Sequence, residues 1–412
     1  MLSQLAALKV SCFRLSMLEP AEIDLILRET AHQLRADKEA ILVANRSDLQ
    51  RMSPEDAKYD RLLLNEKRLE ELALAVEHVA DLPTCLGIIL EEKTRPNGLR
   101  LRKISVPLGA IGMIYEARPN VTIDAFALCF KSGNAVALKG GKEAADSNKA
   151  LVHSVETVLQ RHGLADAVLL LPNEREHLAT VLQAVDYLDV IIPRGSNALI
   201  QYVRDNARVP VIETGAGVVH VYYDAEASII KGRPIIENSK TRRVSVCNAL
   251  DALLLHRDRL SDLPELFSGL IASKNVQIRA DEPAFAALSG IYPPHLLSPA
   301  QEGDFGLEFL DYKMAVKTVD TLEAALAHIA RHSSRHSEVI ITENTATAAR
   351  FTRQVDAAVV YVNASTAFTD GGEFGMGAEI GISTQKLHAR GPFALRELTS
   401  HKWVVEGNGQ IR

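Results

Sequence analysis

The chain has 412 residues, of which 47% are hydrophobic and 24% are charged, with a formal net charge of −6. This composition is ordinary for a globular protein, the length predicts two or three domains, and no basic field exists to hold a nucleic acid. No apolar run approaches the roughly 20 residues that a membrane-spanning helix needs, and the N-terminus lacks the layout of a signal peptide. Four scattered cysteines fit neither a disulfide framework nor a metal site, so we expect a cytoplasmic protein.

The first 92 residues predict helices, because apolar residues recur at steps of three and four. Ser53-Pro54-Glu55 marks a turn and a fresh helix start. Residues 93–108 differ, since apolar and basic residues alternate around the turn signal Asn97-Gly98. This pattern predicts a two-stranded hairpin, which is marginally stable alone and needs another surface to pack on.

Residues 109–225 alternate strand and helix patterns, and VPVIETGAG at 209–217 is expected to be a strand and loop. Repeated strand–helix–strand order indicates a doubly wound parallel sheet, which binds ligands beyond the carboxyl ends of its strands. The chain contains neither a G-x-G-x-x-G fingerprint nor a phosphate loop. The turn at Gly140-Gly141, beside Lys139 and Lys142, is either a phosphate contact at a helix start or a tight turn with solvated lysines.

Residues 226–362 form a second alternating unit around Cys247. Pro234 is expected in the first turn of a helix that ends at the basic pair Arg242-Arg243, and Leu250 to His256 reads as a buried strand. Cys247 would then lie in the loop between them, where Lys240 and the two arginines favour a thiolate. The alternative is that Cys247 is a small packing residue with an inert thiol.

The remainder of this unit and the tail have three notable segments. Residues 256–275 predict one helix, and LEFLDYKMAVKTVD at 307–320 predicts a strand. The tail is rich in glycine between Gly371 and Gly381, which indicates a loop that passes close to other backbone. HKWVVEG at 401–407 predicts a strand that joins the hairpin.

Two segments carry a resemblance to a known family. They are KTRRVSVCNALDALLLHRD around Cys247 and NASTAFTDGGEFGMGAEIGISTQKLHARGPFALRELTSHKWVV in the tail. Both resemble the gamma-glutamyl phosphate reductase family, within the aldehyde dehydrogenase superfamily, and the resemblance extends from KEAILVANRSDL to HKWVV. It implies an α/β fold with two doubly wound parallel-sheet domains plus an oligomerisation hairpin and tail. The implied parts are an NADP-binding domain (1–92 and 109–225), oligomerisation elements (93–108 and 381–412), a catalytic domain (226–362) and a glycine-rich return segment (363–380).

The resemblance also implies roles for individual residues. Cys247 would be the nucleophile, and Asn120 would bind the oxyanion unless Arg118-Pro119-Asn120 is only a turn. Glu213 occupies the place of the general base in aldehyde-oxidising relatives, and we give it a minor role. The implied cofactor contacts are Lys139, Gly140, Arg194, Gly195, Ser196 and Glu308, and the implied substrate contacts are Arg118, His388 and Arg390. Glu308 could instead be an exposed edge residue, and His388 and Arg390 a solvated basic pair.

The implied reaction is the NADPH-dependent reduction of L-glutamyl 5-phosphate to L-glutamate 5-semialdehyde and phosphate, through a cysteine thioester. It is the second step of proline synthesis from glutamate. The charge of Lys139 favours NADP over NAD, and the resemblance implies a homo-oligomer, either a dimer or a tetramer, with a separate glutamate 5-kinase in transient contact. Two alternatives are a dehydrogenase that oxidises another aldehyde with water, for which Glu213 would be essential, and a scaffold without catalysis.

Overall fold

The computed structural model of the chain describes residues 1–56 and 59–412. The described residues form two compact units. Unit 1 comprises Met1–Thr214, Gly375–Gly381 and Phe393–Arg412, and unit 2 comprises Gly215–Phe374 and Ile382–Pro392. Along the sequence, most of unit 2 is therefore inserted between the first segment of unit 1 and its two later segments. The paired strands β14 (Gly381–Ser383) and β15 (Gly391–Phe393) lie where the chain crosses between the units.

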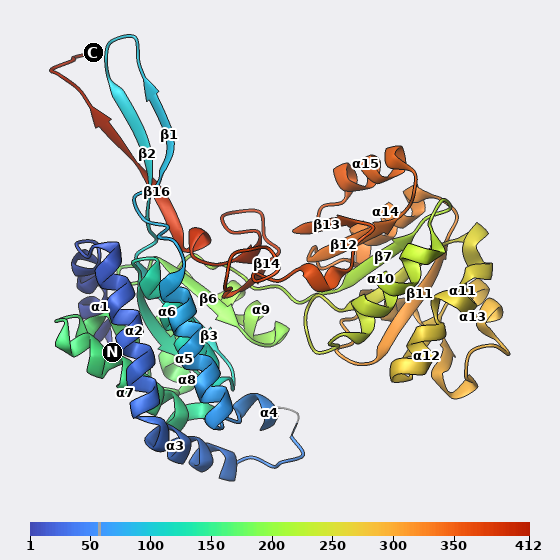
Figure 1. Cartoon of the computed structure of the whole chain (residues 1–412), viewed down its shortest axis with the longest axis horizontal. Coiled ribbons are helices and arrows are strands. Elements are labelled where there is room, and N and C mark those ends of the chain that lie inside the picture. Colours follow the sequence, from blue (N-terminus) through green and yellow to red (C-terminus); the bar gives the residue numbers. More distant parts are fainter. Residues whose placement is uncertain (57–58) are drawn as a thin grey trace. The chain divides into compact units, whose positions relative to one another are not determined.

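Amphipathic helices make up most of the first part of unit 1 (Figure 1). In α2, the buried residues Ile23, Leu27 and Leu34 follow helical spacing, and a capping box between Glu19 and Glu22 fixes the first turn. The helices of this unit are α1 (Leu2–Leu15), α2 (Pro20–Ala36), α3 (Lys38–Gln50), α4 (Tyr59–Leu62), α5 (Glu66–Asp81), α6 (Pro119–Lys131), α7 (Ala145–Arg161), α8 (Arg175–Leu182) and α9 (Asn197–Asn206).

Four parallel strands in the order β5-β4-β3-β6 form the sheet of unit 1. They are β3 (Ala110–Tyr115), β4 (Ala135–Lys139), β5 (Val168–Leu170) and β6 (Val190–Arg194). β3 and β4 are buried along their whole length, which explains their continuous apolar sequences. The chain runs outward from β3 to β5 and then returns to the other side of β3. A topological switch point, where such sheets bind ligands, therefore lies between β3 and β6.

The strand expected at 209–217 is not present. Only one isolated bridge, between Ile191 and Val211, forms there. Pro210 has no N–H to donate to a ladder, and the segment contacts β6 through the Pro210 carbonyl, the Ile212 N–H and the Thr214 hydroxyl. The strand that we did not predict is β7 (Val219–Tyr223), a few residues later. It lies before the expected boundary at residue 225, but it pairs with β8 and β12 and so belongs to unit 2.

A separate three-stranded antiparallel sheet belongs to unit 1 (Figure 1). It contains β1 (Ile89–Thr94), β2 (Arg100–Pro107) and β16 (Thr399–Glu406), in that order. The hairpin turns at Gly98, whose φ of +85° suits glycine. The predicted hairpin is confirmed, although its first strand begins within the region expected to be helical. The predicted pairing of the tail strand with this hairpin is also confirmed.

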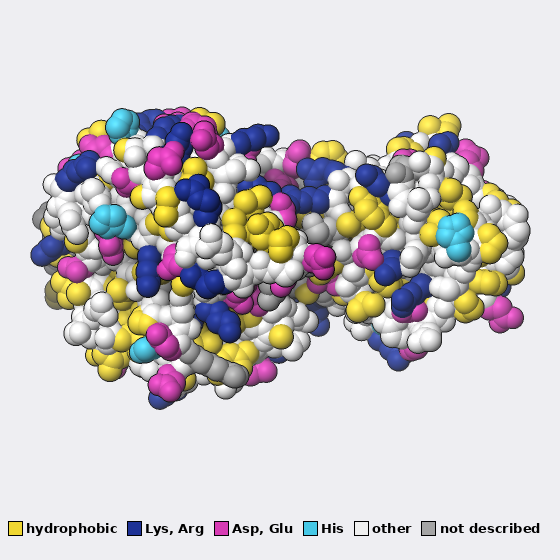
Figure 2. Space-filling model, turned by 90° about the horizontal axis from the view of Figure 1, so that it is seen from below, with side chains coloured by type: hydrophobic (Ala, Val, Ile, Leu, Met, Phe, Trp, Pro, Cys, Tyr) yellow, Lys and Arg dark blue, Asp and Glu magenta, His cyan; other side chains and the backbone are white. Residues whose placement is uncertain are grey.

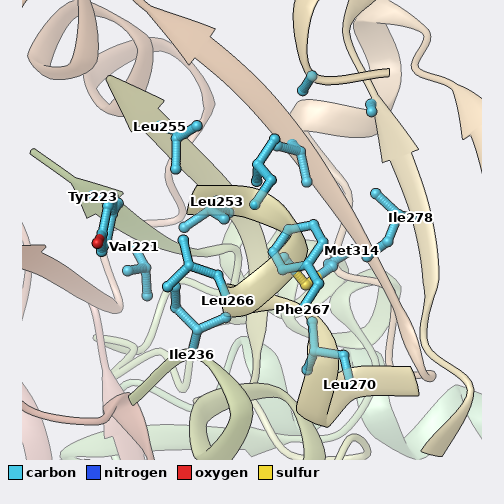
Figure 3. Close-up of a cluster of buried hydrophobic side chains, with 14 of the residues drawn as sticks. Val221, Tyr223, Ile236, Leu253, Leu255, Leu266, Phe267, Leu270, Ile278 and Met314 are labelled. Atoms are coloured by element: carbon cyan, nitrogen blue, oxygen red, sulfur yellow. The ribbon is translucent and has the colours of Figure 1, made fainter. Parts of the chain in front are cut away.

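Seven parallel strands form the sheet of unit 2, in the order β10-β9-β11-β8-β7-β12-β13. Apolar side chains from β7, β8 and the following helices point toward one another on one face of it, among them Tyr223, Leu253 and Phe267 (Figure 3). The strands are β7, β8 (Leu250–His256), β9 (Gln277–Ala280), β10 (Leu297–Pro299), β11 (Lys313–Val319), β12 (Ser337–Ile341) and β13 (Val359–Val362). The helices are α10 (Ile229–Thr241), α11 (Leu263–Leu266), α12 (Ser268–Lys274), α13 (Glu282–Leu288), α14 (Leu322–His332) and α15 (Thr345–Gln354). The predicted α/β fold with parallel sheets is confirmed.

Three local predictions in unit 2 were wrong. Pro234 lies inside α10 rather than in its first turn, and it cannot donate a helical hydrogen bond to Ile230, a residue that is 84% exposed. Residues 256–275 form a 3-10 turn and two short helices instead of one helix, and Pro264 lies in the first turn of the first of these helices, where a proline is tolerated. The segment 307–312 is a loop, since Leu310 has a φ of +51° that no strand residue adopts.

Charged side chains of both signs are intermingled on the face shown in Figure 2. Within the described residues, no helix is long and apolar enough to cross a membrane. The same residues contain no group of three or more potential ligands that could hold a metal ion.

Candidate active site

Cys247 lies in the loop between α10 and β8, as predicted, and its side chain is partly exposed. The other thiols are less suitable as nucleophiles. Burial raises the pKa of Cys85 to about 11, and it also raises the pKa values of Cys12 and Cys129. Because the thiolate is the reactive form, Cys247 is the best placed of the four cysteines to act as a nucleophile.

His336 lies beside that thiol in space, although it is distant in sequence. Its Nε2 lies 3.1 Å from Sγ of Cys247, and its Nδ1 lies 2.8 Å from Oγ of Ser337. The ring is fully buried, and burial lowers the pKa of His336 to about 4. The imidazole is therefore neutral at neutral pH and can accept the thiol proton through Nε2.

Gly217 brings a third loop against the cysteine. A side-chain carbon at Gly217 would overlap the carbonyl oxygen of Cys247, so only glycine fits there. The Gly217 N–H donates to Oε1 of Glu308 at 2.9 Å, and burial raises the pKa of that carboxyl. Glu308, one of the predicted cofactor contacts, is thus half-buried and fixed beside the Cys247 loop.

These three loops meet at one edge of the sheet. Gly217, Cys247 and His336 precede β7, β8 and β12 respectively, and these strands are neighbours. The cluster therefore lies at the amino ends of parallel strands. We had expected ligands beyond the carboxyl ends of the strands in the sheet of unit 1. That expectation does not predict where the Cys247 cluster of unit 2 lies.

Lys240, which we expected to favour the thiolate, lies beside a buried carboxylate. Its ammonium is fully buried and lies 3.9 Å from Oδ1 of Asp251, and it makes no hydrogen bond within the described part of the chain. Burial lowers the pKa of Lys240 and raises that of Asp251. The lysine therefore balances a buried carboxylate at the start of β8. Arg242 and Arg243 have exposed side chains in the loop after α10.

Asn120 is exposed near the start of α6, after β3. Its Nδ2 donates to Oδ2 of Asp124 at 3.1 Å, one helical turn further on. Burial raises the pKa of Asp124 to about 6, and the charge of Arg194 and the Asn120 amide partly oppose this rise. An asparagine amide carries two N–H donors, so this bond orients the group and leaves one donor for a ligand. Asp124 was not among the predicted residues.

Lys139 ends β4, next to the switch point. Its ammonium is nearly buried and makes one long hydrogen bond, 3.4 Å, to the carbonyl of Asn173, and burial lowers its pKa. A side-chain carbon at Gly140 would overlap the side chain of Asn148, so this glycine is required by packing within the unit.

The predicted cofactor contacts Arg194 to Ser196 lie at the end of β6 and the start of α9. Ser196 is the N-cap of α9, but its N–H donates to Glu116 at 3.0 Å and its hydroxyl donates to the same carboxylate at 2.7 Å. A side-chain carbon at Gly195 would also lie 2.8 Å from the Glu116 carboxyl carbon. Glu116 thus occupies the position that an anion would take.

The predicted substrate contacts belong to both units. Arg118 is the N-cap residue of α6, next to Asn120. Arg390 forms an ion pair with Asp356 at 2.8 Å, and His388 is exposed with a φ of +55°. Glu213 lies 3.7 Å from Arg204 and is paired with that cation.

The relatives of this chain decide its family. A gamma-glutamyl phosphate reductase from Parabacteroides distasonis is 59% identical over 388 residues, which cover 94% of this chain and 93% of that protein. The chain belongs to the gamma-glutamyl phosphate reductase family. A crystal structure of the family member from Thermotoga maritima has 38% identity and a TM-score of 0.95, covering 100% of this chain and 99% of that one. No family model matches the chain.

Membership of this family makes the chain an oxidoreductase with an aldehyde-dehydrogenase-like fold. An acetylating aldehyde dehydrogenase from Geobacillus thermoglucosidasius shares that fold, with a TM-score of 0.69 and 17% identity over 100% of this chain and 97% of that one. Cys247 and Asn120 were predicted from the sequence, whereas His336, Gly217, Asp124 and Glu116 were not. The sequence contained no local signal for His336, because a lone histidine before an apolar strand is more often a packing residue.

Proposed function

We propose that the chain reduces L-glutamyl 5-phosphate with NADPH, giving L-glutamate 5-semialdehyde and phosphate through a thioester on Cys247. The single observation that supports the chemistry best is the 3.1 Å contact between the thiol of Cys247 and the buried, neutral ring of His336. The substrate is proposed from the family. This reaction is the second step of proline synthesis from glutamate, in the cytoplasm, and a separate glutamate 5-kinase supplies the acyl phosphate by transient contact.

Acylation begins when Nε2 of His336 accepts the proton of the Cys247 thiol. The thiolate attacks the acyl carbonyl carbon, and the carbonyl electrons move onto oxygen. One N–H of Asn120 and the N–H of Cys247 stabilise that oxyanion; loss of one such donor typically lowers the rate by ~100- to 1000-fold. The C–O bond to phosphate then breaks, phosphate leaves with the electron pair, and the thioester remains on Cys247.

NADPH, when bound, supplies the hydride that reduces the thioester. Some residues of unit 1 fit this cofactor and others do not. Among the described residues Lys139 makes one hydrogen bond, a long one, and it can hold a ribose phosphate, which is why we propose NADP over NAD. The N-terminus of α9 does not fit a pyrophosphate while Glu116 is bound there, so contacts from Arg194, Gly195 and Ser196 require that carboxylate to turn away.

Release of the aldehyde reverses the first proton transfer. The carbonyl re-forms, the C–S bond breaks with its electrons on sulfur, and the proton returns to Cys247 through His336. Water takes no part, so no strong general base is needed. The ion pair of Glu213 with Arg204 agrees with this and argues against a hydrolytic dehydrogenase. We place Arg118, His388 and Arg390 as candidate contacts for the substrate carboxylate or phosphate, because arginine suits both anions.

We also propose that the chain forms a homo-oligomer, a dimer or a tetramer, through the three-stranded sheet. Its outer strands expose apolar side chains that a soluble monomer would rarely leave in water. They are Ile89, Leu90, Trp403 and Val405, which are 43% to 55% exposed. The domain limits expected from the resemblance belong to the same proposal.

The reaction is tested in reverse, by following NADPH absorbance with glutamate 5-semialdehyde, NADP⁺ and phosphate. We expect a rate that requires phosphate and saturates with it. Cys247→Ala should abolish turnover and leave NADPH binding intact, whereas the control Cys12→Ala, in the other partly exposed thiol, should behave as wild type. A rate that is indifferent to phosphate would assign the hydrolytic reaction instead. If the folded protein were inactive with both NADP⁺ and NAD⁺, the remaining alternative would be a scaffold without catalysis.

A further inference from the structure

We propose that the hydroxyl groups of Ser337, Thr369 and Tyr361 form a proton relay that connects the Cys247–His336 pair with the surface of unit 2. This inference rests on the proposed function, because the relay carries the proton that thioester formation displaces. It assigns roles to three residues that lie beyond the nucleophile and its base.

The relay is a continuous series of short contacts. Nδ1 of His336 lies 2.8 Å from Oγ of Ser337. That oxygen lies 2.7 Å from Oγ1 of Thr369, which lies 2.8 Å from the hydroxyl of Tyr361. Ser337 and Thr369 are buried, whereas Tyr361 is half-buried, so the series leads from a buried ring toward solvent.

Neighbouring strands and one loop hold these groups in line. Ser337 is the first residue of β12, and Tyr361 lies on β13, which pairs with β12. Thr369 follows a short 3-10 turn, and its carbonyl accepts from Nδ2 of Asn248 at 3.0 Å. Asn248 is the residue after Cys247, so the nucleophile loop itself fixes the middle of the relay.

The donors and acceptors allow two complete orientations. When Cys247 carries its proton, S–H donates to Nε2, Nδ1–H donates to Ser337, and each hydroxyl donates to the next, so Tyr361 donates outward. When Cys247 is a thiolate, Nε2–H donates to sulfur and every hydroxyl donates in the opposite sense. In both orientations, every group of the series has its hydrogen-bond partners.

The conversion between these orientations moves one proton and nothing else. As the S–H bond breaks, Nε2 gains a proton and Nδ1 passes its own to Ser337, so the imidazole is neutral before and after. Ser337, Thr369 and Tyr361 each accept one proton and release one, and solvent takes the last. Aldehyde release reverses every transfer. A neutral ring at both ends of the process suits a histidine whose buried site disfavours the imidazolium.

Tyr361 works as a hydroxyl in this role and not as a phenolate. Burial raises its pKa, so the group remains protonated throughout the neutral range. Ser337 and Thr369 cannot ionise there either. The series therefore has the chemistry of a conduit, and it stores no charge in the core of unit 2.

The chain provides a matched control for the test. Thr366 lies three residues before Thr369 and is also buried, but its hydroxyl makes no hydrogen bond within the described residues. Thr369→Val and Thr366→Val remove the same atom from neighbouring buried positions. Only the first of them interrupts the relay.

The experiment measures kcat, the KM for NADP⁺ and the solvent deuterium isotope effect on kcat, in the phosphate-dependent reverse assay. We expect Thr369→Val and Tyr361→Phe to lower kcat on the order of tenfold, at the low end of what proton-transfer groups contribute. We also expect KM to stay unchanged and the isotope effect to rise. Thr369→Ser should recover the wild-type kcat, and Thr366→Val should keep it.

Four results would overturn the relay. They are a wild-type kcat in Thr369→Val, a wild-type kcat in Tyr361→Phe, an equal loss in Thr369→Ser, and an equal loss in Thr366→Val. The last two would show that packing matters and hydroxyl transfer does not. Failure of the proposed function is distinguishable, because the wild-type protein itself would then show no phosphate-dependent rate.

Discussion

Gly217 and Cys247 touch through their backbones, with no room for a side chain at Gly217. The loop before β7 therefore sets where the nucleophile loop lies. Gly217→Ala should displace the Cys247 loop and lower kcat severely, with a loss of stability of about 1–3 kcal/mol from overpacking. Kinetics and urea unfolding measure both effects.

The control is Gly303→Ala, since a side-chain carbon there meets nothing within 4 Å. That variant should match wild type in both measurements. Full activity in Gly217→Ala would mean that the contact does not position the nucleophile.

His336→Gln should slow acylation and its reverse by about 10²- to 10⁴-fold, the range that general acid–base groups contribute. The glutamine can hydrogen-bond the thiol but cannot take its proton. Single-turnover kinetics would measure the loss, with His153→Gln, an exposed histidine on α7, as the control. A rate within threefold of wild type would remove His336 from the proton transfer.

The ionised carboxylate of Asp124 should lower the free energy of unfolding of the protein above pH 6. Its pKa in the folded protein is raised to about 6 from an ordinary value of 3.8, so the folded state holds the proton more tightly than the unfolded state. Stability from this group is therefore lost as pH rises from about 4 to about 6, and the cost then stays constant. Asp124→Leu should raise the urea midpoint more at pH 7.5 than at pH 5. An equal gain at both pH values would contradict this.

The same carboxylate should support activity by orienting Asn120. Asp124→Leu removes the acceptor of the Asn120 amide and should lower kcat about tenfold or more, within what one oxyanion donor contributes. Asp124→Asn retains an acceptor oxygen and should keep most of the activity. If the asparagine variant were as slow as the leucine variant, the charge of Asp124 and not its orienting bond would be the important property.

Lys139→Met should raise the KM for NADPH by roughly 10- to 100-fold, the value of one hydrogen bond to a charged group. The KM for NADH should change little, because NADH has no ribose phosphate. The control is Lys142→Met, which removes an exposed lysine from the same turn. Equal losses for the two nucleotides would place Lys139 away from that phosphate.

Oligomerisation through the three-stranded sheet can be tested by measuring the mass of the protein in solution. Wild-type protein should elute well above its chain mass of 45.0 kDa, and Trp403→Lys with Val405→Lys should reduce the measured mass to that of the monomer. Val10→Lys, at an exposed apolar residue on α1, is the control. Light scattering that finds wild type at 45.0 kDa would exclude the proposed oligomer.

Much of the fold was accessible from the sequence because its evidence is local. Alternating strand and helix patterns predicted the parallel sheets, and Asn97-Gly98 predicted the hairpin turn. The errors arose where the backbone departs from what the local composition favours. Pro234 lies inside α10, one turn after the exposed residue Ile230, and Leu310 takes a positive φ in a segment whose composition resembles a strand.

The residues of the candidate site also divide into those that the sequence predicted and those that it did not. Cys247 could be found because its flanking residues carry a family resemblance. His336 could not, because it is 89 residues away and reaches the thiol only through the pairing of β12 beside β7 and β8. Glu116 was also missed, since a carboxylate at a helix start is a property of the folded loop and leaves no spacing in the sequence.

The pairing of β16 with β2 has a consequence for how the protein is made. β2 is synthesised early, but its second partner strand follows the whole of unit 2 in the chain. On the ribosome, one edge of the hairpin must therefore remain open while Gly215–Phe374 emerge and can fold. Open strand edges invite pairing with other chains. Slow translation through unit 2 would prolong that exposure, so the nascent chain is most vulnerable to aggregation in the interval before Thr399–Glu406 emerge.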